Sequence, residues 1–338
     1  MLIKSDFCLK PFNTFGIEAE ARQAAIITSV NDLQELFDDG YLRQQALLIL
    51  GEGSNILFTN NFEGLVLLNQ IRRKEVLEET DRHVFLKVNG GEFWSSLVDY
   101  TVEKGWGGLE NLSLIPGTVG AAPVQNIGAY GVELKDVMHD LEAFDMQTGK
   151  IVQFNKQECA FAYRNSIFKQ QYKNRFFILS VTFQLDKELN FHLEYGPLKA
   201  AFANIPREEI VLKQISEKVK SIRRVKLPAP EELKNAGSFF KNPLVDSEKL
   251  RELQKQFAGI PAYSMPGNKF KLAAGWLIEQ CGWKGKRIGD AGVYEKQSLV
   301  LVNFGNASGT EILALATSIR KSVKQRFGVD LEMEVNVV

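Results

Sequence analysis

The chain has 338 residues, and 41 lysines and arginines balance 41 aspartates and glutamates, so the formal net charge is zero. This balance argues against a nucleic-acid-binding protein or a polybasic membrane-surface protein, since both usually carry a basic excess. Hydrophobic residues make up 45% and charged residues 24%, as in globular chains with a sizeable core, which excludes disorder. The length allows two or three domains of about 100–200 residues each.

The cysteines and histidines give no sign of a disulfide framework or a metal site. Cys8, Cys159 and Cys281 are far apart and lack CxxC spacing, and the three histidines are isolated from one another. We therefore expect no metal. No stretch resembles a signal peptide or approaches the ~18 apolar residues that span a bilayer. A cytoplasmic protein is the expectation.

Short strands and helices alternate in the first half of the chain. The continuous apolar run at 46–50 predicts a strand buried on both faces, which leads directly into a glycine-rich turn. Ser29 is a helix N-cap candidate and Gly40 a helix terminator, so a helix is expected between them. The predicted elements, in order, are strands at 24–28, 46–50 and 84–89 and helices at 29–40 and 93–104.

Residues 105–131 are dense in glycine, which a folded chain retains where the backbone turns sharply or approaches something closely. Leu227-Pro-Ala-Pro230 breaks the preceding helix and is the best domain boundary. Before that boundary we predict strands at 136–144, 150–154 and 176–184 and a helix at 208–226; after it, helices at about 246–258, 269–282 and 309–327 and strands at 291–294, 299–303 and 331–338.

The turn Gly51-Glu-Gly-Ser-Asn55 has the features of a pyrophosphate cradle, because backbone N–H groups of its glycines can face an anion. The alternative is a plain strand–turn–strand connection. A second candidate wall of the cofactor site comprises Pro116–Pro123 and residues 126–131, where a rigid turn is followed by small side chains. The alternative interpretation is that this segment packs two domains tightly together. Two such walls favour a large dinucleotide, although no GxGxxG fingerprint or P-loop is present.

Four polar residues are candidates for chemistry. Arg164 lies between aromatic residues and is either a surface residue or a fixed cation that holds a carboxylate or an enolate. Ser238 follows Gly237 and precedes two phenylalanines; without a GxSxG frame it is a proton donor or a helix cap. Glu332 and Glu334 share one face of the strand predicted for them.

Seven motifs together resemble the UDP-N-acetylenolpyruvoylglucosamine reductase family, and the resemblance runs essentially end to end. It implies an α+β fold with a p-cresol methylhydroxylase-type two-part FAD-binding region at 1–226 (core about 17–188, Tyr-loop insertion about 189–206). A C-terminal α/β substrate-binding domain is implied at 227–338. The motifs are Asn13–Gly16, Leu50–Asn55, Ile115–Gly120, Gln125–Glu133, Tyr163–Ser166, Asn235–Pro243 and Leu331–Val335.

The resemblance implies an NADPH-dependent reduction of UDP-N-acetylglucosamine enolpyruvate to UDP-N-acetylmuramate through non-covalently bound FAD, a step in peptidoglycan precursor synthesis. It implies a UDP-sugar substrate, a cytoplasmic location, and no nucleic acid, membrane or obligate protein partner. By resemblance, Ser238 donates a proton, while Arg164 and Glu334 stabilise the charge that develops on the substrate.

The resemblance also assigns binding residues. The cofactor set is Gly51, Glu52, Gly53, Ser54, Asn55, Ile115, Pro116, Gly117, Gly120, Ala121, Gln125, Asn126, Gly128 and Gly131; the substrate set is Tyr195, Lys226, Asn242 and Lys284. Two positions depart from the family pattern. Asn165 stands where many members have Asp, and Thr118 stands where Cys is frequent. Neither touches the expected chemistry.

Two alternatives remain at this stage. A flavin oxidase of the same fold is one, but many of those tether FAD through His or Cys, and no histidine lies in either glycine wall. A non-catalytic protein that binds nucleotide sugars is the other; it would keep the glycine turns and show no visible flavin absorbance.

Overall fold

The computed structural model describes residues 2–338, which form two compact units. Unit 1 contains the residues before Cys8, Ala21–Glu52 and Glu63–Arg224, and unit 2 contains Cys8–Glu20, Gly53–Phe62 and Val225–Val338. Each unit is therefore assembled from pieces that are distant in the sequence. The domain division at 226/227 stays a prediction.

The first sheet has the strand order β1-β2-β5-β3, in which β3 and β5 run parallel with Ala46 opposite Gly64. The helix α1 (Val30–Asp38) follows β2 and begins with the predicted cap, a reciprocal pair of hydrogen bonds between Ser29 and Asp32. The expectation that 46–50 is buried on both faces is wrong, because β3 is an edge strand and its burial alternates. The strands are β1 (Ile3–Cys8), β2 (Glu20–Ile27), β3 (Ala46–Leu50) and β5 (Phe62–Asn69).

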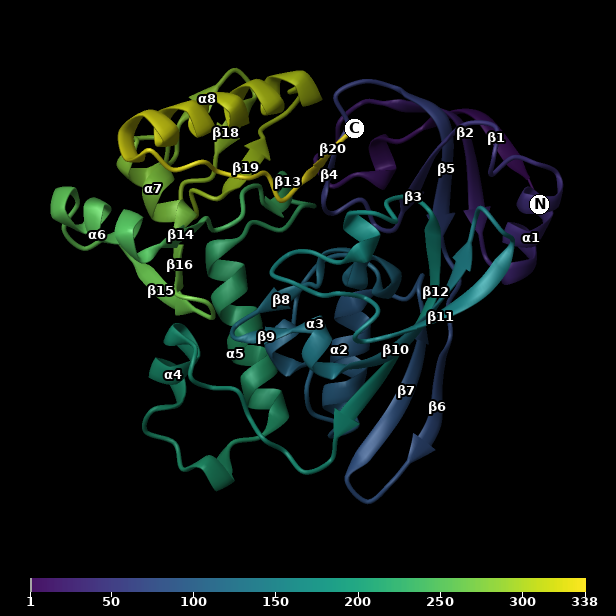
Figure 1. The fold of residues 1–338 in the computed structure, drawn as a ribbon, viewed down its shortest axis with the longest axis horizontal. Coiled ribbons are helices and arrows are strands. Elements are labelled where there is room, and N and C mark those ends of the chain that lie inside the picture. The colour runs from purple at the N-terminus through teal and green to yellow at the C-terminus, as the bar shows by residue number, and fades with distance from the viewer. Residues whose placement is uncertain (1) are drawn as a thin grey trace. The chain divides into compact units, whose positions relative to one another are not determined.

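The second sheet, β11-β10-β12-β7-β6, is antiparallel throughout and belongs to unit 1 (Figure 1). The strand–helix units expected in the first half therefore do not form a parallel sheet around this core. The strand predicted from 136 begins later, because Leu134–Val137 forms α3, which Glu133 and Asp136 cap reciprocally. The strands are β6 (Lys74–Glu79), β7 (His83–Asn89), β10 (Met138–Asp145), β11 (Lys150–Asn155) and β12 (Phe176–Asp186).

The glycine-dense segment folds into short turns that pack on this sheet. Its hydrophobic residues join the core that contains Trp94 of α2 (Trp94–Glu103) and Phe183 of β12. Its elements, with the adjoining η4, are η2 (Glu110–Leu112), η3 (Val119–Gln125), β8 (Gly128–Ala129), β9 (Val132–Glu133) and η4 (Ile167–Lys169).

The end of unit 1 carries α4 (Gly196–Phe202) and most of α5 (Leu212–Lys226), whose apolar faces share one core cluster. The helix expected from 208 starts at Leu212 instead, because Arg207–Glu209 after Pro206 forms the short 3-10 turn η5.

Unit 2 is built on the sheet β13-β19-β18-β17 and on a three-stranded antiparallel sheet, β14-β16-β15. The helix α8 (Gly309–Phe327) matches its prediction, with a capping box at Ser308 and Glu311 and a left-handed Gly328 at its end. The other elements are η1 (Lys10–Phe12), β4 (Ile56–Leu57), β13 (Lys234–Ser238), β14 (Leu244–Asp246), α6 (Ser247–Gln256), β15 (Ala262–Met265), β16 (Lys269–Leu272), α7 (Ala274–Gln280), β17 (Arg287–Ile288), β18 (Ala291–Val293), β19 (Val300–Asn303) and β20 (Asn336–Val337).

Two predictions for unit 2 are corrected. The helix expected at 269–282 is a strand followed by a shorter helix, because Lys269–Leu272 pairs with both β14 and β15. The strand expected at 331–338 is reduced to Asn336–Val337, which pairs parallel with Ile56–Leu57.

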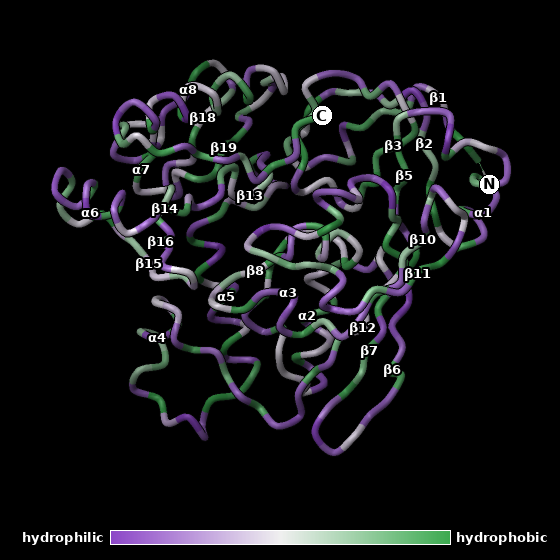
Figure 2. Tube along the Cα trace, in the orientation of Figure 1, coloured by the Kyte–Doolittle hydropathy of each residue, from purple (hydrophilic) through white to green (hydrophobic). Residues whose placement is uncertain are grey.

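Hydrophobic and hydrophilic residues follow one another at short intervals along the trace (Figure 2). Within residues 2–338, no helix combines the length and the apolar character required to cross a bilayer.

Candidate active site

The two glycine segments meet in unit 1, where the end of β3 lies against the loop before η3. The Glu52 carboxylate accepts a hydrogen bond of 2.6 Å from the Gly117 backbone N–H. A Cβ atom at Gly51 would lie 2.4 Å from the Thr118 hydroxyl oxygen, so only glycine permits this approach. Gly117 itself has a φ of +118°, which favours glycine.

Thr118 provides a test of whether this place fits a polar cofactor. Its hydroxyl oxygen is buried and has no hydrogen-bond partner among residues 2–338. A buried hydroxyl without a partner costs about 1–3 kcal/mol, so such atoms mark places where another molecule completes the hydrogen bonding. The exposed Glu52 side chain and the glycine backbone beside Thr118 therefore fit a nucleotide cofactor such as FAD.

Other glycines of the predicted cofactor set serve close packing of the chain, the alternative considered for them. Gly53 has a φ of +65°, and its missing Cβ would lie 2.0 Å from the Phe12 carbonyl oxygen within unit 2. Gly120 lies against Gly90 in unit 1, with 3.0 Å from its missing Cβ to the Gly90 Cα. Of the remaining set, unit 1 holds Ile115, Pro116, Ala121, Gln125, Asn126, Gly128 and Gly131, and unit 2 holds Ser54 and Asn55.

Arg164 is held in a strained loop of unit 1. Its φ is +53°, a left-handed conformation that is uncommon for a long side chain. Its guanidinium donates a hydrogen bond of 2.6 Å to the Gly128 carbonyl. The next loop residues are fixed by Ser166, whose hydroxyl donates to the Val124 carbonyl at 2.7 Å. The backbone therefore orients Arg164 toward the hairpin β8–β9.

Tyr195 precedes α4 and is 45% exposed. Its ring lies edge-on to that of Tyr130, with 5.8 Å between the ring centroids. Asn111 ties the two segments together, because its amide donates to the carbonyls of Tyr130 (2.9 Å) and His192 (2.8 Å). Sequence reasoning missed Asn111 and named Tyr130 only as part of a glycine wall.

Arg223 is a further residue that the sequence interpretation missed. Its guanidinium Nε donates a hydrogen bond of 3.2 Å to the carbonyl of Leu114. Burial is the main cause that lowers its pKa; Tyr130 opposes this shift and the charge of Arg164 adds to it. Helical periodicity could have identified the position, because Ile215 and Val219 are buried on α5 and Arg223 follows four residues later.

In unit 2, Ser238 and Glu334 lie on adjacent segments. Ser238 ends β13, and the Glu334 N–H donates a 2.8 Å hydrogen bond to the carbonyl of Phe239, the next residue. Asn55 adds a hydrogen bond from its amide to the Glu334 carbonyl at 3.3 Å. Within unit 2, Asn55 therefore lies beside the backbone of Glu334.

The strand predicted for Glu332 and Glu334 does not form. Their segment forms only an isolated bridge, between Phe240 and Met333. Glu332 is exposed and pairs with Lys241, whereas Glu334 is half-buried. The two carboxylates therefore have different surroundings, which the predicted alternation could not distinguish.

The predicted substrate residues of unit 2 lie at helix ends and on the surface. The Asn242 side-chain oxygen accepts a hydrogen bond of 2.9 Å from the N–H of Ala274, the first residue of α7. Lys226 is the exposed last residue of α5. Lys284 forms an exposed ion pair of 2.9 Å with Glu279. These positions leave the two ammonium groups accessible to phosphate oxygens.

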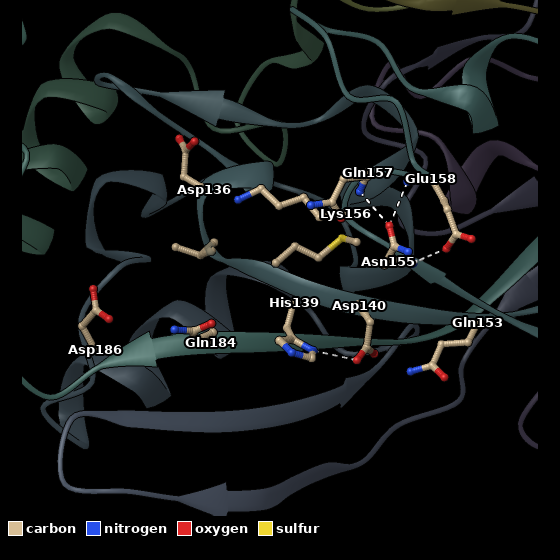
Figure 3. A pocket seen from close by; sticks show the side chains of 12 residues that line it. Asp136, His139, Asp140, Gln153, Asn155, Lys156, Gln157, Glu158, Gln184 and Asp186 are labelled. Atoms are coloured by element: carbon tan, nitrogen blue, oxygen red, sulfur yellow. Dashed lines mark hydrogen bonds and ion pairs between the residues drawn. The ribbon is translucent and has the colours of Figure 1, made fainter.

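Unit 1 also has a polar hollow of about 620 Å³ on its antiparallel sheet (Figure 3). The polar groups there bond to one another: His139 contacts Asp140 at 2.8 Å, and the Asn155 side chain accepts from the N–H groups of Gln157 and Glu158. Within the described residues, no group of acids, histidines and cysteines is arranged to hold a metal ion. We assign this hollow no role.

Comparisons with known proteins identify both parts of the chain. Residues 21–155 match the profile of an FAD binding domain, and residues 229–338 match that of the C-terminal domain of UDP-N-acetylenolpyruvoylglucosamine reductase. The UDP-N-acetylenolpyruvoylglucosamine reductase of Pseudomonas putida is 47% identical over 329 residues, with 97% of each chain covered. That of Burkholderia pseudomallei (strain 668) is 47% identical over 331 residues, covering 97% of this chain and 95% of the relative.

Solved structures agree on the fold. A UDP-N-acetylenolpyruvylglucosamine reductase from Thermus caldophilus superposes with a TM-score of 0.69 and 22% identity, covering 99% of each chain. A solvent-stable cholesterol oxidase gives a TM-score of 0.50 and 11% identity, covering 99% of this chain and 86% of the other. The expected mixed fold, an FAD-binding region of the p-cresol methylhydroxylase type with a C-terminal substrate domain, is confirmed.

Proposed function

Because the chain belongs to the UDP-N-acetylenolpyruvoylglucosamine reductase family, we propose that it reduces UDP-N-acetylglucosamine enolpyruvate to UDP-N-acetylmuramate. NADPH is the hydride donor and FAD the cofactor of this step in peptidoglycan precursor synthesis. The observation that carries the proposal is 47% identity over 97% of the chain, and the glycine cradle with the unpartnered Thr118 hydroxyl supports it. The substrate is a UDP-sugar, and the reaction requires no nucleic acid, membrane or second protein.

The cofactor residues supply hydrogen bonds and close backbone approach. Gly51, Glu52, Gly117 and Thr118 would hold FAD through their backbone groups, the Glu52 carboxylate and the Thr118 hydroxyl. When bound, FAD supplies the hydride relay between NADPH and the substrate.

Arg164 and Glu334 are the proposed stabilisers of the substrate's charge. Addition of hydride to the terminal vinyl carbon leaves negative charge on the neighbouring carbon, which is conjugated with the substrate carboxylate. A cation or acid aimed at the carboxylate oxygens lowers the energy of that dianion. Arg164 provides the cation from a loop that its hydrogen bond to Gly128 helps to fix. Glu334 is half-buried and provides a carboxyl group, and hydrogen bonds to Phe239 and Asn55 hold its backbone in place.

Ser238 is the proposed proton donor to that carbon. A hydroxyl is a weak acid, but a carbanion is a stronger base than the alkoxide that results, so placement matters more than acidity. The neighbouring Gly237 has open space around it: a Cβ there would meet no heavy atom within 4 Å. The backbone beside Ser238 is therefore open to a ligand, and Ser238 itself is half-buried.

Four further residues are the proposed contacts to the UDP-sugar. Lys226 and Lys284 present ammonium groups that suit a diphosphate. Asn242 and Tyr195 would supply polar contacts to the sugar or phosphates, with the segment of Tyr195 closing over the bound substrate. The three cysteines are free thiols in the structure, which suits a reducing compartment, and we place the enzyme in the cytoplasm.

Anaerobic spectroscopy of the purified protein tests the function. Visible flavin absorbance, its loss on addition of NADPH, and its return on addition of the enolpyruvyl sugar are the expected results. A colourless protein would contradict the proposal and favour a non-catalytic binding protein. Failure of the enolpyruvyl sugar to restore the absorbance would favour an oxidase of the same fold.

Substitution Ser238→Ala tests the proton donor. Loss of a positioned general acid typically slows a reaction by about 10²–10⁴-fold, so we expect that loss in the rate of substrate reduction. Flavin reduction by NADPH and the FAD content should change less than about twofold. Ser264→Ala, at an exposed serine of β15, is the matched control. Equal loss in both half-reactions would refute the assigned role.

A further inference from the structure

Arg223 of α5 carries a positive charge that no carboxylate of the described residues neutralises. Within residues 2–338, its one hydrogen bond goes to the carbonyl of Leu114, and no carboxylate pairs with it. Most buried or half-buried arginines have a carboxylate partner, because the charge loses hydration on burial. Arg223 is half-buried, so the absence of a carboxylate partner among the described residues requires an explanation.

Three hydrogen bonds, joined by short stretches of backbone, link the segments that hold Arg223 and Arg164 inside unit 1. Arg223 donates to Leu114, and Asn111, three residues earlier, donates to the Tyr130 carbonyl. Tyr130 follows Gly128 by two residues on the β8–β9 hairpin, and Gly128 accepts from Arg164. The two guanidiniums are therefore held by neighbouring segments, and the charge of Arg164 contributes to lowering the pKa of Arg223.

The backbone of this region is strained in a way that marks binding sites. Eight described non-glycine residues have positive φ angles, and four of them lie here. Such residues cost about 1–3 kcal/mol each and persist where the surrounding structure enforces them, often at ligand sites. The four are Leu114 (+59°), Asn126 (+46°), Tyr130 (+50°) and Arg164 (+53°).

Tyr130 supplies a neutral donor beside the cations. Burial is the main cause that raises its pKa and Arg223 opposes that shift, so the phenol keeps its proton at neutral pH. Two guanidiniums and a phenol form a donor set that matches the oxygens of a planar oxyanion. Two like charges in a half-buried place repel each other, and an anion that binds both removes the repulsion.

We propose that Arg223 is a positioning residue that binds the carboxylate of the substrate together with Arg164, with Tyr130 as a third donor. This inference rests on the proposed function, since it takes the substrate's carboxylate to be the group that Arg164 contacts. Binding by two cations fixes the carboxylate plane, which sets the orientation of the carbon that accepts hydride. The substrate's diphosphate is the competing source of the same oxyanion chemistry.

Two ligands that differ in the carboxylate separate these sources. UDP-N-acetylmuramate carries a carboxylate on its lactyl group, and UDP-N-acetylglucosamine lacks it, while both carry the diphosphate. Affinities for the oxidised holoenzyme are measured by calorimetry or by the perturbation of flavin absorbance. In Arg223→Gln we expect affinity for UDP-N-acetylmuramate to fall roughly 10- to 100-fold, from loss of a charged hydrogen bond. Affinity for UDP-N-acetylglucosamine should change less than about threefold.

Two further variants make the test independent of folding. Arg223→Lys keeps the positive charge but loses the planar arrangement of N–H donors of the guanidinium. Its affinity for UDP-N-acetylmuramate should therefore fall between those of the wild type and Arg223→Gln. Arg224→Gln removes the neighbouring exposed arginine of α5 and should leave both affinities unchanged. The urea midpoint and the FAD content of each variant are measured in parallel.

The outcomes distinguish the proposals. Equal weakening of both ligands in Arg223→Gln would mean that Arg223 binds the diphosphate, and loss of FAD from both Arg223 variants would assign it to the cofactor; either result overturns the inference. Unchanged affinities would overturn it as well. If the wild-type protein binds neither ligand, the proposed function fails, whatever the effect of Arg223.

Discussion

Arg175 and Arg223 both belong to unit 1, but their surroundings are opposite. Arg175 makes a two-pronged contact with the buried Asp145, at 3.1 Å from Nε and 2.8 Å from Nη2. The hydrogen bond that Arg175 donates to Asp145 raises the pKa of Arg175. Arg223 donates its hydrogen bond to a backbone carbonyl and not to a carboxylate. Burial and the charge of Arg164 lower the pKa of Arg223.

The difference separates a residue that serves the fold from one that serves a ligand. The charge of Arg175 is neutralised by the chain itself, so its removal affects stability. The charge of Arg223 is not neutralised by the chain, so the folded protein alone gains little from it. The polar hollow of Figure 3 resembles the first case, because His139 pairs with Asp140 and the Asn155 side chain accepts from the backbone N–H groups of Gln157 and Glu158.

The largest effect that would sharpen this contrast is expected from Arg164→Gln. Loss of a cation aimed at the developing charge should lower the rate of substrate reduction by roughly 10²–10³-fold. The free energy of unfolding should change by less than about 0.5 kcal/mol, because glutamine can also donate a hydrogen bond to the Gly128 carbonyl. Rapid-reaction spectroscopy and urea unfolding measure the two quantities. A large loss of stability with little loss of rate would place Arg164 in the same class as Arg175.

An intermediate effect, on stability alone, is expected from Asp145→Asn. Loss of the charged contact with Arg175 should lower the free energy of unfolding by about 2 kcal/mol at pH 7, with no change in ligand affinity. Burial raises the pKa of Asp145, but hydrogen bonds from Arg175 and Gln147 outweigh it and leave the pKa below its ordinary value.

The pH dependence of that effect follows from the sign of the shift. Because the folded-state pKa of Asp145 is depressed, its contribution is complete above the unfolded value of about 3.9 and is lost as the pH falls through the folded value. The stability difference between the wild type and Asp145→Asn should therefore shrink below about pH 4. A difference that persists unchanged at pH 2.5 would contradict this account.

The smallest effect is expected from Thr118→Val, which removes the unpartnered buried hydroxyl. Loss of one hydrogen bond to the cofactor should weaken FAD affinity by about 5- to 10-fold, while the stability of the apoprotein stays the same or rises. Thr101→Val is the matched control, because the buried Thr101 hydroxyl donates to Val98 at 2.9 Å. That variant should lose about 1 kcal/mol of stability and keep its FAD affinity. Identical behaviour of the two variants would show that Thr118 has no ligand role.

Local signals in the sequence predicted the elements that depend on local physics. The helix at 309–327 was predicted at its observed bounds, because a capping serine, an apolar periodicity and a terminal glycine all lie within it or beside it. The two glycine segments were recognised by composition, and Glu52 and Gly117 do contact each other. Arg164, Ser238 and Glu334 were candidates from the residues around them, and the family resemblance supplied their roles.

Features that depend on partners distant in the sequence were missed. Lys269–Leu272 has a helical pattern, but pairing with β14 and β15 makes it a strand. The burial of β3 depends on its place at a sheet edge, which its apolar run does not encode. Arg223 was not singled out, because its hydrogen bond to the Leu114 carbonyl joins positions that are distant in the sequence.

The scattered composition of unit 2 has a consequence for biosynthesis. Residues 8–20 and 53–62 leave the ribosome early, yet the segments that complete their unit begin at Val225. β4 (Ile56–Leu57) pairs with β20 (Asn336–Val337) only after nearly the whole chain has been made. Until then the edge of β4 has no strand partner, and unpaired edges invite contacts between nascent chains. All segments of unit 1 have been made by residue 224, so translation order favours its folding first.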